Sequence, residues 1–179
     1  MSFLPKLKDI KAFVLDIDGV LTDSTILITE TGEQLRRFNV KDGYALQLAV
    51  KKGYFFCIIS GGKSQTVVSR FNGLGITDVY LKVDKKLDVF YDFLKKHHLE
   101  ADQVVYIGDD IPDIPVMKVV GLPACPSDAV EEVKALSSYI SPKRGGEGCV
   151  RDLIEKVLKV QGNWYDSNPS GQEEFIPSL

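Results

Sequence analysis

The sequence predicts an α/β protein with a doubly wound, Rossmann-like parallel sheet. Short runs rich in apolar residues alternate along the chain with longer segments of helical period, which is the rhythm of a parallel sheet covered by helices on both faces. Three of the short runs, at residues 12–15, 55–59 and 104–107, are apolar throughout. Continuous apolar runs of this length are typical of strands that are buried on both faces.

The predicted elements follow one another in a regular order. The sequence indicates strands at 11–17, 54–60, 78–81 and 104–110, because these runs are short and dominated by apolar residues. The segments of helical period lie between and after them, at 43–53, 64–75, 86–98, 114–120 and 150–160. Each strand is therefore followed by a helix, as a doubly wound sheet requires.

One segment, residues 24–40, breaks this alternation. It contains two β-rich runs around Thr31-Gly32, which predicts an inserted β-hairpin flap over about 25–40 where a short loop is usual. The chain length leaves no room for a second domain elsewhere, so we expect one domain over residues 1–160. Residues 161–179 lose all periodicity and are rich in Ser, Pro, Gly and Asn, which is typical of a flexible C-terminal tail.

The composition argues against several classes of function. The net charge is −3 and the pI is about 5.4, so we expect no nucleic acid partner. Cys57, Cys125 and Cys149 are widely spaced without a CxxC pair, which disfavours a disulfide framework and a zinc site. Asp9 and Asp16 interrupt the apolar residues near the N-terminus before a signal peptide or membrane span could form. We therefore expect a cytoplasmic protein without a membrane partner.

The residues that can carry chemistry follow the predicted strands. Ligands of open α/β sheets bind beyond the carboxyl ends of the strands, so residues at these ends should converge. The set comprises five carboxylates, a hydroxyl, a glycine pair and a lysine that opens a helix: Asp16, Asp18, Asp109, Asp110, Asp113, Ser60, Gly61, Gly62 and Lys86. Oxygen ligands without His or Cys select Mg²⁺, which prefers one or two carboxylates together with phosphate oxygens of a substrate.

A magnesium ion would explain why Asp16 and Asp18 stand side by side after a buried strand, since buried carboxylates need a compensating cation. Lys86 is a second positive charge suited to a phosphate, and Ser60 with the following glycine amides supplies donors for phosphoryl oxygens. A carboxylate in contact with magnesium stays ionised and can attack phosphorus, while its neighbour moves the proton. The residues thus predict phosphate ester hydrolysis through an aspartyl-phosphate.

Four motifs in this order resemble those of the haloacid dehalogenase-like hydrolase superfamily: DIDGVLTD (16–23), IISGG (58–62), a lysine ahead of a helix, and GDDIPD (108–113). The early hairpin and the stretches NVKDGYAL (39–46), SRFNGLGI (69–76) and KRGGEGCVR (143–151) are similar to the capless 3-deoxy-D-manno-octulosonate 8-phosphate phosphatases. The resemblance implies no cap domain, magnesium as cofactor and hydrolysis of that sugar phosphate, a step of lipopolysaccharide precursor synthesis.

The resemblance also implies a role for each site residue. Asp16 is the nucleophile and Asp18 the acid/base, and the metal ligands are Asp16, the main-chain carbonyl of Asp18, and Asp109. The remaining roles are phosphate contacts for Ser60 and Lys86 and a supporting position for Asp113, with Asp110 as a further supporting candidate.

Substrate contacts are implied in two further places. The family usually has Arg after the glycine of the second motif, whereas this chain has Gly62-Lys63, so Gly61, Gly62 and Lys63 are the candidates there. Capless relatives form tetramers in which another subunit closes the site, so we expect a homotetramer through the hairpin. Lys143 and Arg144 would then reach the sugar bound by a neighbouring subunit, since arginine suits a carboxylate.

Two alternatives remain open at this point. One is a phosphatase for a nine-carbon keto-acid sugar 9-phosphate, a related branch that carries Glu where this chain has Gly62. The other is a receiver-like phosphoacceptor module without enzymatic activity, because receiver domains also combine clustered Asp, a hydroxyl and a Lys around magnesium. Asp18 argues for the enzyme, since a switch that must keep its phosphoaspartate gains nothing from an acid/base two residues on.

Overall fold

The computed structural model describes residues 4–165, and its centre is a six-stranded parallel sheet in the order β5-β4-β1-β6-β7-β8. The chain fills one half of the sheet from β1 outward and then returns to β6 beside β1, so the strand order reverses between these two strands. The strands are β1 Ala12–Leu15, β4 Phe55–Ile59, β5 Asp78–Tyr80, β6 Val104–Ile107, β7 Leu122–Cys125 and β8 Tyr139–Ile140. The predicted doubly wound fold is confirmed.

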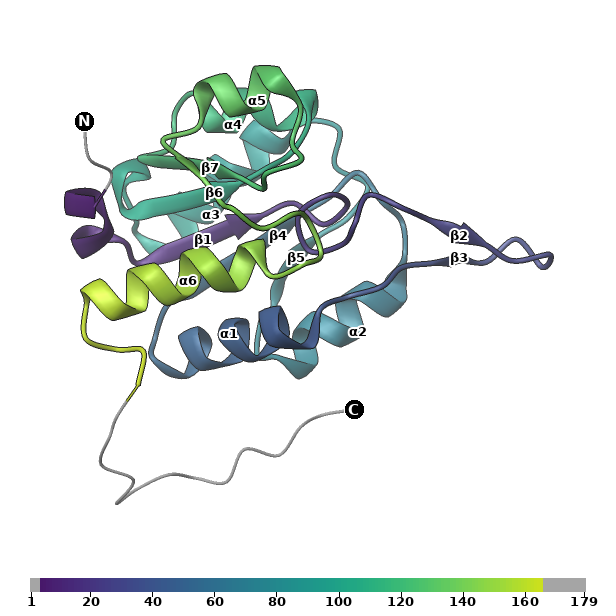
Figure 1. Cartoon of the computed structure of the whole chain (residues 1–179), viewed down its shortest axis with the longest axis horizontal. Helices are drawn as coiled ribbons and strands as arrows, with labels where there is room; N and C mark the ends of the chain where they lie inside the picture. Colours follow the sequence, from purple (N-terminus) through teal and green to yellow (C-terminus); the bar gives the residue numbers. More distant parts are fainter. Residues whose placement is uncertain (1–3, 166–179) are drawn as a thin grey trace.

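Helices cover both faces of this sheet (Figure 1). One face carries α1 (Val40–Lys51), α2 (Gln65–Gly73) and α6 (Cys149–Val160), and the other carries α3 (Lys86–His97), α4 (Ile114–Met117) and α5 (Glu131–Leu136). Three short 3-10 segments complete the described elements: η1 Leu4–Asp9, η2 Ala101–Gln103 and η3 Ile111–Asp113. The sequence pattern did not predict β7, β8 or α5, which are short elements near one edge of the sheet.

Two hydrophobic cores lie on the two faces of the sheet. Because successive side chains of a strand point to opposite faces, Phe13 and Leu15 of β1 enter the core under α1 and α6, whereas Ala12 and Val14 enter the core under α3. All four side chains of β1 are buried, as the apolar run predicted. The sheet therefore holds the carboxyl ends of β1 and β6 rigidly next to each other.

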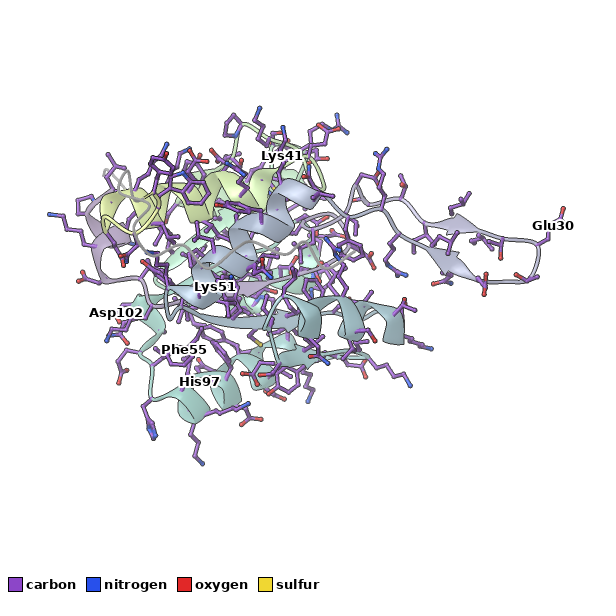
Figure 2. All side chains as sticks on the ribbon, turned by 90° about the horizontal axis from the view of Figure 1, so that it is seen from below. Glu30, Lys41, Lys51, Phe55, His97 and Asp102 are labelled. Atoms are coloured by element: carbon purple, nitrogen blue, oxygen red, sulfur yellow. The ribbon has the colours of Figure 1, made fainter. Side chains whose placement is uncertain are left out.

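The predicted hairpin is present between β1 and α1. Its strands, β2 (Leu27–Ile28) and β3 (Gln34–Leu35), pair antiparallel and are only two residues long each. Gly32 has a φ of +83° in the connecting turn, a value that favours glycine. The hairpin projects away from the sheet (Figure 1), with Glu30 at its tip and Asp102 near the opposite end of the molecule (Figure 2).

Residues 161–164, which follow α6, pack against the rest of the domain. The Gln161 side-chain amide donates to the carbonyl oxygens of Leu7 (2.7 Å) and Ile10 (2.9 Å), and Trp164 packs against the core. Most of the tail expected at 161–179 lies outside the described residues, which end at 165. None of the helices in residues 4–165 combines the length and apolar character that a membrane span requires.

The three cysteines are buried free thiols. Cys57 lies in β4, Cys125 ends β7 and Cys149 opens α6. They pack in the two cores as small apolar side chains.

Candidate active site

A cavity of about 580 Å³ lies at the carboxyl ends of β1, β4 and β6. It brings together nine residues that the sequence singled out: Asp16, Asp18, Ser60, Gly61, Gly62, Lys86, Asp109, Asp110 and Asp113. Ligands of a doubly wound sheet bind at this edge, beside the point where the strand order reverses. Among the described residues that line the cavity, six are aspartates and Lys86 is the one cation.

Lys86 lies at the centre of the buried charges. Its Nζ is 2.8 Å from Oδ1 of Asp16 and 2.7 Å from Oδ1 of Asp113, and its side chain is only 7% exposed. Burial opposes the charge of Lys86, yet the two carboxylates raise its pKa above the ordinary lysine value. An ammonium group has three N–H donors, so these two contacts leave one for a phosphoryl oxygen.

Asp113 is saturated by donors from its own chain. Its Oδ1 accepts from Lys86 and from the Tyr106 hydroxyl at 2.6 Å, and its Oδ2 accepts from the backbone N–H groups of Asp109 (2.9 Å) and Asp110 (3.2 Å). With four bonds made, this carboxylate orders the loop after β6 and orients the lysine. The geometry suits the supporting position that the sequence analysis assigned to it.

Tyr106, whose side chain is fully buried in β6, was not among the residues predicted for the site. The sequence does show a hydroxyl group within an otherwise apolar run. A buried hydroxyl needs a hydrogen-bond partner, so this pattern indicates a polar contact of Tyr106. The partner is the carboxylate of Asp113, so Tyr106 belongs to the framework of the site.

Asp16 and Asp109 are the two carboxylates of the cluster with a strongly raised pKa. Burial raises the pKa of Asp16 to about 6, with Lys86 lowering it and Asp113 raising it further. Burial, followed by the charges of Asp16, Asp113 and Asp110, raises the pKa of Asp109 to about 8. Both shifts report the cost of holding carboxylates together in a buried place.

These carboxylates fit a divalent cation. One carboxylate oxygen from each of Asp16, Asp109 and Asp113 lies within 4.8 Å of the other two. Because four donors already occupy the Asp113 carboxylate, Asp16 and Asp109 are the members left to bind a cation. Oδ1 of Asp109 is buried and has no hydrogen-bond partner in the described part of the chain. A hard cation accepts such oxygen ligands and removes the electrostatic cost of the cluster. Asp110 does not join it, because its exposed side chain caps η3 by accepting from the N–H of Ile111 at 2.8 Å.

Ser60 and its glycines form the wall of the cavity after β4. Ser60 is buried, and its Oγ accepts from the N–H of Gly62 at 3.0 Å. The hydroxyl hydrogen of Ser60 therefore stays available for a phosphoryl oxygen. The Gly62 amide, which the sequence analysis counted as a phosphate donor, is directed to Ser60 in this structure.

Asp18 is held by a residue that the sequence analysis did not select. Arg36, one residue beyond β3 of the hairpin, donates from Nε to Oδ1 of Asp18 at 2.7 Å and from Nη2 to Oδ2 at 3.0 Å. These bonds to Asp18 raise the pKa of Arg36. The sequence shows two adjacent arginines, and neighbouring residues of an extended segment point to opposite sides. Nothing in the pattern tells which of the two faces the site.

Lys63 and Arg144 do not line this cavity. Lys63 follows the glycine pair but its side chain is exposed to solvent. Arg144 is 65% exposed and its Nε lies 3.4 Å from Asp128. The loop that carries Arg144 packs against the turn after β1, because the N–H of Gly146 donates to the carbonyl oxygen of Val20 at 3.0 Å.

Comparison with known proteins agrees with the geometry. A family model described as haloacid dehalogenase-like hydrolase matches residues 65–153. A 3-deoxy-D-manno-octulosonate 8-phosphate phosphatase from Escherichia coli is 38% identical over 159 residues, which is 89% of this chain and 85% of the relative.

Solved structures of such phosphatases superpose on most of this chain. One from Yersinia pestis gives a TM-score of 0.89 at 32% identity and covers 91% of this chain and 88% of that chain. Another, from Moraxella catarrhalis, was solved in complex with a magnesium ion, a phosphate ion and a KDO molecule; its TM-score is 0.87 at 36% identity, with 90% and 93% of the two chains covered. The chain belongs to the haloacid dehalogenase-like hydrolases, and within them to the family of the 3-deoxy-D-manno-octulosonate 8-phosphate phosphatases.

Proposed function

We propose that this protein is a magnesium-dependent phosphatase that hydrolyses 3-deoxy-D-manno-octulosonate 8-phosphate to the free sugar acid and phosphate, and so serves lipopolysaccharide precursor synthesis. The observation that carries the proposal is the cluster of Asp16, Asp109 and Asp113 at the carboxyl edge of the sheet, in which Lys86 pairs with Asp16 and Asp113. Relatives with this activity match most of the chain, and one of them holds magnesium, phosphate and the sugar acid.

Asp16, Asp109 and the main-chain carbonyl of Asp18 would hold the magnesium ion. When bound, the ion supplies positive charge that neutralises the phosphoryl oxygens and the carboxylates around them. Lys86 adds a second positive charge, which Asp113 holds in position. The charges that would stabilise the phosphoryl group are therefore in place before the substrate binds. Ser60 would donate its free hydroxyl hydrogen to one phosphoryl oxygen.

The chemistry has two half-reactions. An oxygen of Asp16 attacks phosphorus, the bond from phosphorus to the sugar oxygen breaks, and Asp18 gives that oxygen its proton. Asp18, now ionised, takes a proton from water, whose oxygen attacks the aspartyl-phosphate. The bond from Asp16 to phosphorus breaks, phosphate leaves, and both carboxyl groups return to their starting states. Lys86 keeps Asp16 in place between the two steps through its 2.8 Å contact.

Phosphate release from a panel of phosphorylated 2-keto-3-deoxy sugars, with and without magnesium, tests this proposal. We expect the highest kcat/KM for the eight-carbon 8-phosphate and no turnover after chelation of the metal. A higher kcat/KM for the nine-carbon 9-phosphate would reassign the substrate. The receiver-like alternative is disfavoured by the family membership, and it predicts a stable phosphoprotein without release.

The surroundings of Gly62 favour the eight-carbon substrate over the nine-carbon one. A Cβ on residue 62 would lie 3.2 Å from Oγ of Ser60 and 3.5 Å from Nη2 of Arg36. The glutamate carried by the nine-carbon branch would crowd the Ser60 hydroxyl, while its Cβ would meet Arg36 at an ordinary van der Waals distance.

The hairpin supports a homotetramer, which is the second part of our proposal. Ile26, Leu27, Ile28 and Leu35 expose large apolar side chains on a two-stranded ribbon, with Leu27 and Ile28 each 66% exposed. A two-stranded hairpin is marginally stable alone, so these edges and side chains would gain from contact with another subunit. Light scattering should report a tetramer, and L27D should shift the protein toward smaller species. A wild-type monomer would refute this assembly.

Arg144 would act in such a tetramer on a neighbouring subunit, since it does not line the cavity of its own chain. Co-assembly of a D16N chain with an R144A chain tests this role. Mixed sites then combine an intact Asp16 with an intact Arg144, and activity should recover above both parents. No recovery in verified mixed tetramers would restrict Arg144 to its own subunit. We further propose a cytoplasmic location, which fits the three free cysteines.

A further inference from the structure

Arg36 supplies a positive charge next to Asp18, although it belongs to none of the four motifs. Its side chain is 7% exposed and reaches from the base of the hairpin to Asp18, which lines the cavity. Its stem also lines a second cavity of about 230 Å³, together with Ser64, Thr66 and Arg70. Arg36 therefore lies between the cavity at the carboxyl edge of the sheet and a smaller space whose polar lining is shared with the apolar side chains of Leu35, Phe38 and Val67.

The pairing with Arg36 fixes the orientation of the carboxylate to which the proposed function assigns proton transfer. Both oxygens of the Asp18 carboxylate accept a hydrogen bond from the guanidinium, at 2.7 and 3.0 Å. Each oxygen keeps a second lone pair, but the bidentate pair holds the whole group toward the guanidinium. An acid has to turn one oxygen with its proton toward the leaving sugar oxygen, and a new partner for the guanidinium would free Asp18 to do so.

The guanidinium already binds a carboxylate in the bidentate geometry that arginine prefers. A second carboxylate of the same shape can take the place of Asp18 without any loss of charge pairing. Gly62 lies beside this pair, since a Cβ on residue 62 would be 3.5 Å from Nη2 of Arg36 and 3.7 Å from Oδ2 of Asp18. A 2-keto sugar acid carries such a carboxylate, whereas a neutral sugar phosphate does not.

We infer that Arg36 is a specificity residue that binds the carboxylate of the sugar-acid substrate, and that this exchange releases Asp18 for proton transfer. The inference rests on the proposed function for the identity of the substrate class. No covalent bond changes in the exchange: two N–H···O bonds to Asp18 are replaced by two to the substrate. The enzyme thereby completes its catalytic arrangement only when an acidic sugar phosphate is bound.

Kinetics of the full-length variants R36Q and R36K with two substrates tests the inference. The substrates are 3-deoxy-D-manno-octulosonate 8-phosphate and ribose 5-phosphate, which has an alkyl phosphate but no carboxylate. We expect R36Q to lose about 10- to 100-fold in kcat/KM for the acid, the range of a charged bidentate pair, while kcat for ribose 5-phosphate rises because Asp18 is free. R36K keeps the positive charge but cannot form the bidentate pair, so its kcat/KM for the acid should lie between those of R36Q and the wild type.

R37Q is the matched control. Arg37 is the next residue, is 81% exposed and pairs with Asp23 at 2.8 Å, so its loss should leave both substrates unchanged. An equal loss for both substrates in R36Q would show that Arg36 serves the phosphate or the placement of Asp18, and would overturn the inference. Unchanged kinetics for the acid in R36Q would overturn it as well.

A binding measurement separates this inference from the proposed function. Calorimetry of the free sugar acid, with its neutral amide as a second ligand, needs no turnover. We expect the acid to bind the wild type about 10- to 100-fold more tightly than R36Q, and the amide to bind both variants equally weakly. If the acid binds R36Q more weakly but the wild type releases no phosphate, the proposed function is refuted and the carboxylate site is supported. If the acid binds wild type and R36Q equally and turnover is normal, the carboxylate site is refuted and the proposed function is supported.

Discussion

Gly19 and Asp109 approach each other so closely that a Cβ on residue 19 would lie 1.9 Å from Oδ2 of Asp109. Gly19 belongs to the turn after β1, and Asp109 follows β6, so this contact closes the site across the two central strands. Gly19 also has a φ of +94°, which other residues avoid. The position of the Asp109 carboxylate therefore depends on glycine in the first motif.

G19A should displace Asp109 and impair the metal site. We expect a raised magnesium requirement, a loss of kcat of at least about tenfold from misplacement of a catalytic group, and a destabilisation of about 1–3 kcal/mol from the strained backbone. Magnesium titrations of activity and urea unfolding measure the two effects separately.

G32A provides the control for backbone strain. Gly32 has a similar φ of +83°, but nothing lies within 4 Å of the place where its Cβ would be. This variant should show the strain in urea unfolding while its magnesium requirement stays that of the wild type. If G19A and G32A behave alike in the magnesium titration, the clash with Asp109 has no functional consequence.

D16N and D18N test the two carboxylates of the first motif. D16N removes the proposed nucleophile and should abolish turnover, since an amide oxygen is a poor nucleophile toward phosphorus. D18N removes the proposed proton donor, a change that typically costs about 10²–10⁴-fold in kcat. Circular dichroism should show a folded protein in both cases. Wild-type phosphate release by either variant would refute the mechanism.

The sequence predicted the central sheet and most of the site because both depend on local patterns. Apolar runs mark β1, β4 and β6, and the residues that follow each run must meet at one edge. The edge strand β8 has only two residues, and its pairing with β7 comes from tertiary contact rather than from local propensity. Short elements of this kind carry too little periodicity to be recognised.

The part of the site that the sequence missed comes from long-range contacts. Arg36 reaches Asp18 only because the hairpin folds back at its base, and no spacing rule connects residues 18 and 36. The burial of Lys86 could not be predicted from its position, because a lysine that opens a helix is usually solvated. Its place between Asp16 and Asp113 depends on the packing of three separate loops. The charge balance of the motifs indicated a functional lysine, while the structure identifies its partners.

D109N should weaken magnesium binding rather than abolish the chemistry. The amide keeps the size of the side chain but removes one negative charge from the metal cluster, so the magnesium concentration for half-maximal activity should rise. D110N is the neighbour control, because the exposed Asp110 caps η3 and lies outside the cluster. Its magnesium requirement should change much less than that of D109N. An unchanged titration for D109N would remove Asp109 from the ligands.

Asp42 is expected to make the stability of the fold depend on pH. It lies in α1, is 1% exposed, and its Oδ1 accepts from the N–H of Arg151 in the first turn of α6 at 2.7 Å, while its Oδ2 has no partner among the described residues. Burial raises the pKa of Asp42 from 3.8 to about 6, against the hydrogen bond from Arg151 that lowers it.

The sign of the effect follows from the higher pKa in the folded state. Between about pH 4 and pH 6 the folded chain binds this proton more tightly than the unfolded chain, so the contribution of Asp42 to stability improves as the pH falls through 6 toward 4. Above pH 6 the ionised group costs stability, by about 3 kcal/mol for a shift of this size. D42N keeps an oxygen acceptor for Arg151 and carries no charge. Urea denaturation measures the unfolding free energy of wild type and of D42N at each pH. From pH 5 to pH 7 the wild type should lose about 1 kcal/mol of stability relative to D42N. The difference between the two variants cancels the titration of the other carboxylates, and a difference that stays constant over this range would show that Asp42 has its ordinary pKa in the folded protein.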